Sequence, residues 1–175
     1  IKDGSGRDWK IMSDSSISTE RGGESVELVS PICKYGDIPV IQEIVRQLRH
    51  NGAIANSSCG IHVHVNAAPH NAVTLRNIAN IIASKEDLLY KALKVDVHRE
   101  NYCQKTDYRF LERLNQRPPR TLDQVKRLWY NGRDESGIHY SSTRYRGLNL
   151  HSVFSKGTIE FRLFNGTTHA GEVKT

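Results

Sequence analysis

Cys59-Gly60-Ile61-His62-Val63-His64-Val65-Asn66 is the stretch that decides the fold, because its apolar and polar residues alternate strictly. Successive side chains of a β-strand point to opposite faces of a sheet. The aliphatic residues therefore share one face, whereas His62 and His64 share the other. We expect a strand with one face toward a core and the other carrying ligand-type side chains.

Three further stretches repeat this division. In Thr158-Ile159-Glu160-Phe161-Arg162-Leu163-Phe164 the apolar residues share one face, and Glu160 and Arg162 share the other. Val26-Glu27-Leu28 and Leu148-Asn149-Leu150 show the same alternation over fewer residues. The pattern predicts an antiparallel sheet with helices on its apolar face and an open polar face. That polar, concave face would gather Glu27, His62, His64, Asn149, Glu160 and Arg162.

The remaining elements follow from periodicity and from turn residues. Helical spacing of apolar residues predicts helices over 38–50, 71–94, 107–115 and 121–131. Strands are expected over 7–13 and 24–29, with a turn around Arg21-Gly22-Gly23. A hairpin is expected from strands over 145–154 and 158–164, joined at Ser155-Lys156-Gly157. The sequence thus predicts an α+β fold with a single core and one domain over residues 1–175.

Composition limits the class of protein. Of the 175 residues, 37% are hydrophobic and the apolar runs are short, which excludes a membrane span and a membrane partner. The three cysteines are widely spaced and odd in number, so we expect a reducing, cytoplasmic compartment. A net charge of +6 would suit a nucleic-acid binder or an enzyme that handles nucleotides and carboxylates. Charge alone does not choose between the two.

The polar face predicts phosphoryl-transfer chemistry. Glu27, Glu160 and His62 form a ligand set for a divalent cation, and Mg²⁺ is favoured over Zn²⁺ if water and phosphate oxygens complete the shell. Arg162, on the same face as Glu160, could contact a phosphoryl group. Each pattern alone has a simpler interpretation, because surface histidines and surface Glu–Arg pairs are common. Their coincidence favours the functional interpretation.

The chain resembles the amidoligase family, which is related to glutamate-cysteine ligases and glutamine synthetase. The residues that carry the resemblance lie in order along nearly the whole chain: Glu27-Leu28-Val29-Ser30-Pro31, the Cys-Gly-x-His-Val-His-Val motif from Cys59, Leu148-Asn149-Leu150, and Thr158 to Thr167 with its Thr-x-Glu-Phe-Arg motif. The resemblance implies a glutamine synthetase-like curved sheet and an ATP-dependent ligase. Such an enzyme joins a small-molecule or peptide carboxylate to an amine through an acyl phosphate.

The resemblance also implies roles for individual residues. Glu27, His62 and Glu160 would bind Mg²⁺, or Mn²⁺ in its place. His64 would lie near ATP, and Arg162 would act with Glu160 in catalysis at the transferred phosphate. Asp14 and Arg144 would lie at the substrate end, and Arg146 and Asn149 would contact the cofactor. The substrates' identities and the oligomeric state have no readable signal.

One departure from the family pattern concerns the start of the chain. These ligases normally begin with a strand that bears a Glu-x-Glu-like pair, and residues 1–8 contain no such pair. The chain ends at residues 171–175, where further helices are expected. We therefore expect a fragment that lacks the N-terminal strand and C-terminal helices. A noncatalytic relative is the alternative.

A metal-dependent hydrolase and a nucleic-acid-binding module are the two alternatives to a ligase. A metal-dependent hydrolase or cupin-like oxygenase also uses His-x-His on a strand, but Pro69 and His70 stand where a cupin places its glutamate. A barrel hydrolase needs more strands than this chain offers. A basic nucleic-acid-binding module is suggested by residues 109–133, where arginines alternate with aromatic residues. Those residues are better explained as packed helices, so we do not expect a nucleic-acid partner.

Overall fold

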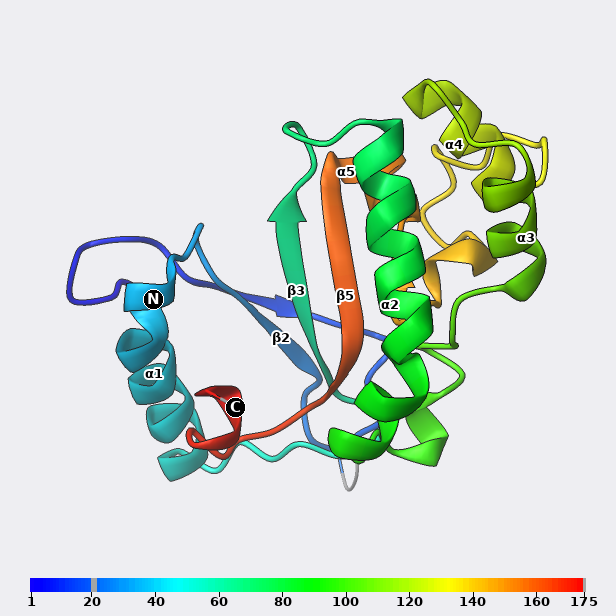
Figure 1. The fold of residues 1–175 in the computed structure, drawn as a ribbon. Helices are drawn as coiled ribbons and strands as arrows, with labels where there is room; N and C mark the ends of the chain where they lie inside the picture. The colour runs from blue at the N-terminus through cyan, green and yellow to red at the C-terminus, as the bar shows by residue number, and fades with distance from the viewer. Residues whose placement is uncertain (20–21, 175) are drawn as a thin grey trace. The chain divides into compact units, whose positions relative to one another are not determined.

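The computed structural model describes residues 1–19 and 22–174 and has an α+β secondary structure, as the sequence predicts (Figure 1). Two small antiparallel sheets and five α-helices lie within these residues. The chain divides into two compact units, one of residues 1–59 and 166–175 and the other of residues 60–165.

The first unit contains a two-stranded ribbon and one helix. Strand β1 (Lys10–Ser13) pairs with β2 (Val26–Val29), and α1 (Ile38–His50) follows the short helix η1 (Tyr35–Asp37). The Arg7 guanidinium donates to both carboxylate oxygens of Asp37, at 3.0 and 2.9 Å. The strands and the helix confirm the sequence prediction. Of the predicted turn around 21–23, Arg21 lies outside the described residues.

The second unit is built on a three-stranded antiparallel sheet. Its strands are β3 (Gly60–Asn66), β4 (Leu148–Asn149) and β5 (Thr158–Asn165), and their order is β3-β5-β4. Glu160 on the central strand lies opposite His64 of β3 and Asn149 of β4. The pairing shifts between Ile61 and Val63, so that two residues of β5 face His62 alone, as in a β-bulge. The register brings the polar residues of all three strands together.

Helices cover the apolar face of this sheet. Helix α2 (Ala72–Ala92) runs along β5 (Figure 1), and its N-cap is Asn71, whose side chain accepts from the Thr74 amide. Helices α3 (Tyr108–Gln116) and α4 (Leu122–Trp129) add to the same core. The fully buried aliphatic residues at its centre are Leu75, Leu114, Val125, Leu148, Leu150 and Ile159. This arrangement confirms the predicted helical layer.

One part of the burial prediction is wrong. Val63 and Val65 were expected in the core, but they remain 42% and 43% exposed. No residue of β3 belongs to the buried core, whereas the central strand β5 buries Ile159 and Leu163 there and β4, the other edge strand, buries Leu148. In the first unit Val26, also expected in a core, is 47% exposed.

The predicted hairpin over 145–164 is only partly present. Residues 148–149 form β4, but His151–Lys156 form the short helix α5, where the sequence predicted a strand and turn. Val153 and Phe154 are neighbours in the chain and both pack against the core, which a helical turn allows and a strand does not. Gly157 ends the helix with φ of +73°, a conformation that favours glycine.

Candidate functional site

Glu160 is the centre of the polar cluster in the second unit. It is 3% exposed, and it lies in the middle of β5, where both neighbouring strands face it. Its Oε1 accepts a hydrogen bond from Arg162 Nη1 at 2.8 Å, and its Oε2 accepts one from Asn149 Nδ2 at 2.7 Å. Both oxygens of a buried carboxylate are thereby held in fixed positions.

The Glu160 carboxylate is ionised. Burial by itself would raise its pKa, but the charge of Arg162, with a smaller effect from the Asn149 hydrogen bond, lowers it. The Arg162 side chain is itself only 6% exposed, so the two charges form a buried ion pair. Such a pair is costly to desolvate and depends on both partners.

His62 and His64 face the same carboxylate but do not bond to it. His62 Nδ1 lies 3.6 Å and His64 Nε2 lies 3.8 Å from Glu160 Oε1, both beyond hydrogen-bonding distance. Burial, with a smaller effect from the Arg162 charge, lowers the pKa of His62 to about 3. Burial lowers the pKa of His64 as well. Both rings are therefore neutral at pH 7 and offer lone pairs or N–H groups rather than positive charge.

Arg162 is anchored from several sides. Its Nε donates to the Tyr102 carbonyl oxygen at 3.4 Å, and its guanidinium lies 6.0 Å from the centre of the Tyr145 ring. Its own carbonyl oxygen accepts from the buried Arg99 guanidinium at 3.0 Å. A Cβ on Gly60 would overlap that guanidinium. The glycine of the Cys-Gly-x-His motif therefore leaves space for the Arg99 guanidinium, which holds the backbone of β5 at Arg162 by this hydrogen bond.

The cluster fits a divalent cation in part. Two ligands that are each about 2.1 Å from one ion lie about 3 to 3.6 Å apart, which matches the His62 Nδ1 to Glu160 Oε1 separation of 3.6 Å. Within the described ranges, no group of three or more His, Cys, Asp and Glu side chains is arranged as a metal site. Phosphate oxygens or water would have to complete the shell, as they commonly do for Mg²⁺.

The other predicted site residues divide between the two units. Glu27 in β2 and Asp14 after β1 belong to the first unit, so their predicted roles stay predictions. Arg146 donates to the Lys105 carbonyl oxygen at 2.9 Å and lies 3.8 Å from an Asp107 oxygen. Its predicted contact with the cofactor is untested. Arg144, in contrast, lines a cavity next to Glu160.

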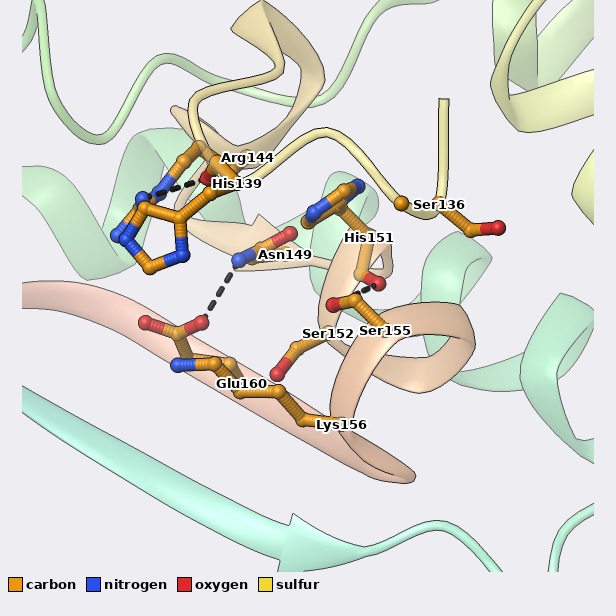
Figure 2. Close-up of a pocket in the computed structure, with 10 residues that line it drawn as sticks. Ser136, His139, Arg144, Asn149, His151, Ser152, Ser155, Lys156 and Glu160 are labelled. Atoms are coloured by element: carbon orange, nitrogen blue, oxygen red, sulfur yellow. Dashed lines mark hydrogen bonds between the residues drawn. The ribbon is translucent and has the colours of Figure 1, made fainter. Parts of the chain in front are cut away.

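That cavity lies wholly in the second unit and has a volume of about 260 Å³ (Figure 2). It is lined by residues of the loop before β4, of β4 itself, of α5 and of β5. They are Ser136, Gly137, His139, Arg144, Asn149, His151, Ser152, Ser155, Lys156 and Glu160.

Sequence reasoning selected three of these residues, namely Arg144, Asn149 and Glu160, and missed the others. His151 stands next to Leu150 on the predicted polar face, so the alternation did carry a signal for it. The sequence predicts a turn at Lys156 and carries no signal for the helix α5. That helix ends at Lys156, just before β5 begins.

The comparisons with known proteins identify the family of the chain. A family model described as "Putative amidoligase enzyme" matches residues 1–175, and the chain belongs to that family. The family name denotes a ligase-type function. Searches of curated proteins and of solved structures give no match. Among the described residues, no helix is both long and apolar enough to cross a membrane.

Proposed function

We propose that the chain is an ATP-dependent carboxylate–amine ligase with a glutamine synthetase-like sheet, and that the Glu160 cluster is its phosphoryl-transfer site. The observation that carries the proposal is the buried Glu160–Arg162 pair, with two neutral imidazoles within 4 Å of the same carboxylate oxygen. Family membership over residues 1–175 supports the reaction class. Substrates would be a small-molecule or peptide carboxylate and an amine.

The proposed reaction has two steps. A carboxylate oxygen of the acid attacks the γ-phosphorus of ATP, the bond to the β-phosphate oxygen breaks, and ADP leaves. The amine nitrogen then attacks the acyl carbon, the bond to the phosphate oxygen breaks, and phosphate leaves. The nitrogen loses a proton as the amide forms. Catalysis of the first step depends mainly on position and on stabilisation of charge at the phosphoryl group.

Residues of the cluster have distinct parts in this proposal. The Arg162 guanidinium would contact the transferred phosphoryl group, and its fixed position means that little reorganisation is needed. Glu160 and His62 would hold Mg²⁺, which neutralises phosphate charge when bound. His64, held at Nδ1 by the Thr158 hydroxyl at 2.8 Å, would lie beside ATP. Glu27 is proposed as a further ligand and Asp14 as a substrate contact.

The test is turnover by the intact protein with ATP, Mg²⁺ and panels of carboxylic acids and amines. We expect ADP and phosphate to form only when an acid and an amine are both present, with one amide formed per ADP. Release of phosphate that needs water alone would favour a hydrolase and would contradict the proposal. Mn²⁺ in place of Mg²⁺ is expected to support the same reaction.

His62→Gln is the informative variant, because it removes an imidazole nitrogen from a side chain that is 26% exposed without adding charge. We expect turnover to fall at least tenfold, the effect typical of a lost metal contact. His98→Gln is the matched control, since His98 is exposed in the short helix η2 (Val97–Arg99) and, unlike its neighbour Arg99, makes no hydrogen bond to Glu160 or Arg162 within the described residues. If the two variants have equal activity, His62 is not part of the catalytic site.

A further inference from the structure

The cavity beside Glu160 contains a buried acceptor without a donor. Asn149 is 2% exposed, and its Nδ2 is used by Glu160 at 2.7 Å. Its Oδ1 has no hydrogen-bond partner among residues 1–19 and 22–174. Figure 2 shows this oxygen on the side of the amide that faces His151, away from Glu160. An unsatisfied buried acceptor costs about 1–3 kcal/mol, which a ligand with an N–H group would recover.

The same cavity also presents positive groups. Arg144 donates to the His139 carbonyl oxygen at 2.8 Å, and its guanidinium lies 5.6 Å from the ring centres of both Tyr140 and Tyr145. These contacts hold the guanidinium in place, and within the described part of the chain its other N–H groups have no hydrogen-bond acceptor. Lys156 is exposed and forms no ion pair with any described residue. Because Arg162 already balances Glu160, the charge left over in the cavity is positive.

His151 adds a neutral donor. Its Nδ1 lies 2.7 Å from the Tyr130 hydroxyl, and both residues are buried. Burial raises the pKa of Tyr130 and lowers the pKa of His151, so the phenol keeps its proton and the ring is uncharged. A phenol that donates to Nδ1 leaves the imidazole proton on Nε2. Nε2 can then donate to an anionic group of a ligand.

We propose that this cavity binds an α-amino acid, with its amino nitrogen at Asn149 Oδ1 and its carboxylate at Arg144, His151 and Lys156. A carboxylate alone would leave the Asn149 acceptor unsatisfied, and a simple amine would leave the positive groups unpaired. The volume of about 260 Å³ is sufficient for a ligand of this size. Asn149, predicted from the sequence as a cofactor contact, would instead contact this ligand.

The role of this ligand rests on the proposed function. Asn149 joins the two sites, because its Nδ2 donates to Glu160, while the residue also lines the cavity and its Oδ1 has no partner within the described residues. An amino nitrogen at Oδ1 is therefore close to the proposed phosphoryl-transfer site. The amino acid would be the amine substrate of the ligase, and its own carboxylate would be the feature that the enzyme recognises.

Binding can be measured without turnover. The twenty common L-amino acids are titrated calorimetrically into the intact protein, with and without Mg²⁺ and a nonhydrolysable ATP analogue. The tightest binder is compared with the amine that lacks its α-carboxylate and the acid that lacks its α-amino group. We expect each analogue to bind at least tenfold more weakly. Equal affinity of either analogue, or no amino-acid binding in both conditions, would overturn the proposal.

Variants of the two cationic residues identify where the carboxylate binds. Arg144→Gln and Lys156→Gln change partly or fully exposed side chains, so the fold should persist. Each should weaken the amino acid and the deaminated acid several-fold, but not the decarboxylated amine. Arg109→Gln, an exposed arginine on α3, is the matched control and should change none of the three affinities. Amino-acid affinity that is unchanged in both cavity variants would refute the assigned contacts.

Turnover separates this inference from the proposed function. If an amino acid binds as expected but no acid and amine give ADP, the ligase proposal fails and the binding site stands. If ADP and amide form equally well with amines that lack a carboxylate, the ligase proposal stands and this inference fails.

Discussion

The buried Glu160–Arg162 pair predicts a large and specific loss of stability when one charge is removed. Glu160→Gln keeps the size of the side chain but leaves the Arg162 guanidinium, at 6% exposure, without its counter-ion. Breaking a buried pair from one side typically costs about 3–5 kcal/mol. We expect a decrease of this size in the free energy of unfolding of the second unit.

The control is an exposed ion pair of the same chemistry. Glu43 lies 3.0 Å from Arg46, with both side chains 57% exposed, so Glu43→Gln should cost about 0–1 kcal/mol. In the double variant Glu160→Gln/Arg162→Met no unpaired charge remains. Its loss should therefore be clearly smaller than the sum of the two single losses.

Urea unfolding can be followed by tryptophan fluorescence. Trp9 lies in the first unit and Trp129 in the second, so a Trp9→Phe background restricts the signal to the unit that contains Glu160. The midpoint and slope of the transition give the change in free energy of unfolding. If Glu160→Gln costs no more than Glu43→Gln, the pair does not behave as a buried one and our account of the site is wrong.

Three further predictions concern the second unit. The folded-state pKa of His62 is about 3, below its unfolded value of about 6.5. As the pH falls below 6.5, the unfolded chain therefore binds a proton that the folded protein does not, and the contribution of His62 to the free energy of unfolding is lost. Between pH 8 and pH 5, His62 should contribute roughly 2 kcal/mol to the loss of stability in chemical unfolding. His62→Gln should reduce the loss by about this amount, while the lowered pKa values of His64 and His151 account for a remainder. An unchanged loss in that variant would contradict the assignment. Gly60→Ala should lower the free energy of unfolding in urea by about 1–3 kcal/mol, because the added Cβ meets the Arg99 guanidinium. The control is Gly36→Ala, which should be near neutral because no atom lies within 4 Å of the added carbon. Similar losses in the two variants would contradict the packing of Arg99 against Gly60. Leu114→Ala, at a fully buried position, should lower the free energy of unfolding by about 2–5 kcal/mol. Leu88→Ala, on the exposed face of α2, should lower it by less than about 0.5 kcal/mol. Equal effects of the two variants would place Leu114 outside the core.

The sequence by itself determined the helices over 38–50 and 71–94, the strands around His62 and Glu160, and the polar face they share. Periodicity is a local property, and it is strongest where a strand or helix has one buried face. The motif around Glu160 also identified the family. These predictions needed no knowledge of which strands are neighbours.

The tertiary structure decided which residues are buried and which polar groups meet, and the periodicity of the sequence does not contain this information. Val63 and Val65 alternate as core residues do, yet they are exposed because the buried core covers β4 and β5 and includes no residue of β3. Val153 and Phe154 both pack against the core because residues 151–156 form a helix, and that helix brings His151 and Lys156 to the cavity. The unsatisfied Asn149 oxygen exists only because Glu160 takes the other end of its amide. Contacts between residues distant in sequence decide which polar groups meet, and an alternating pattern records only which way each one points.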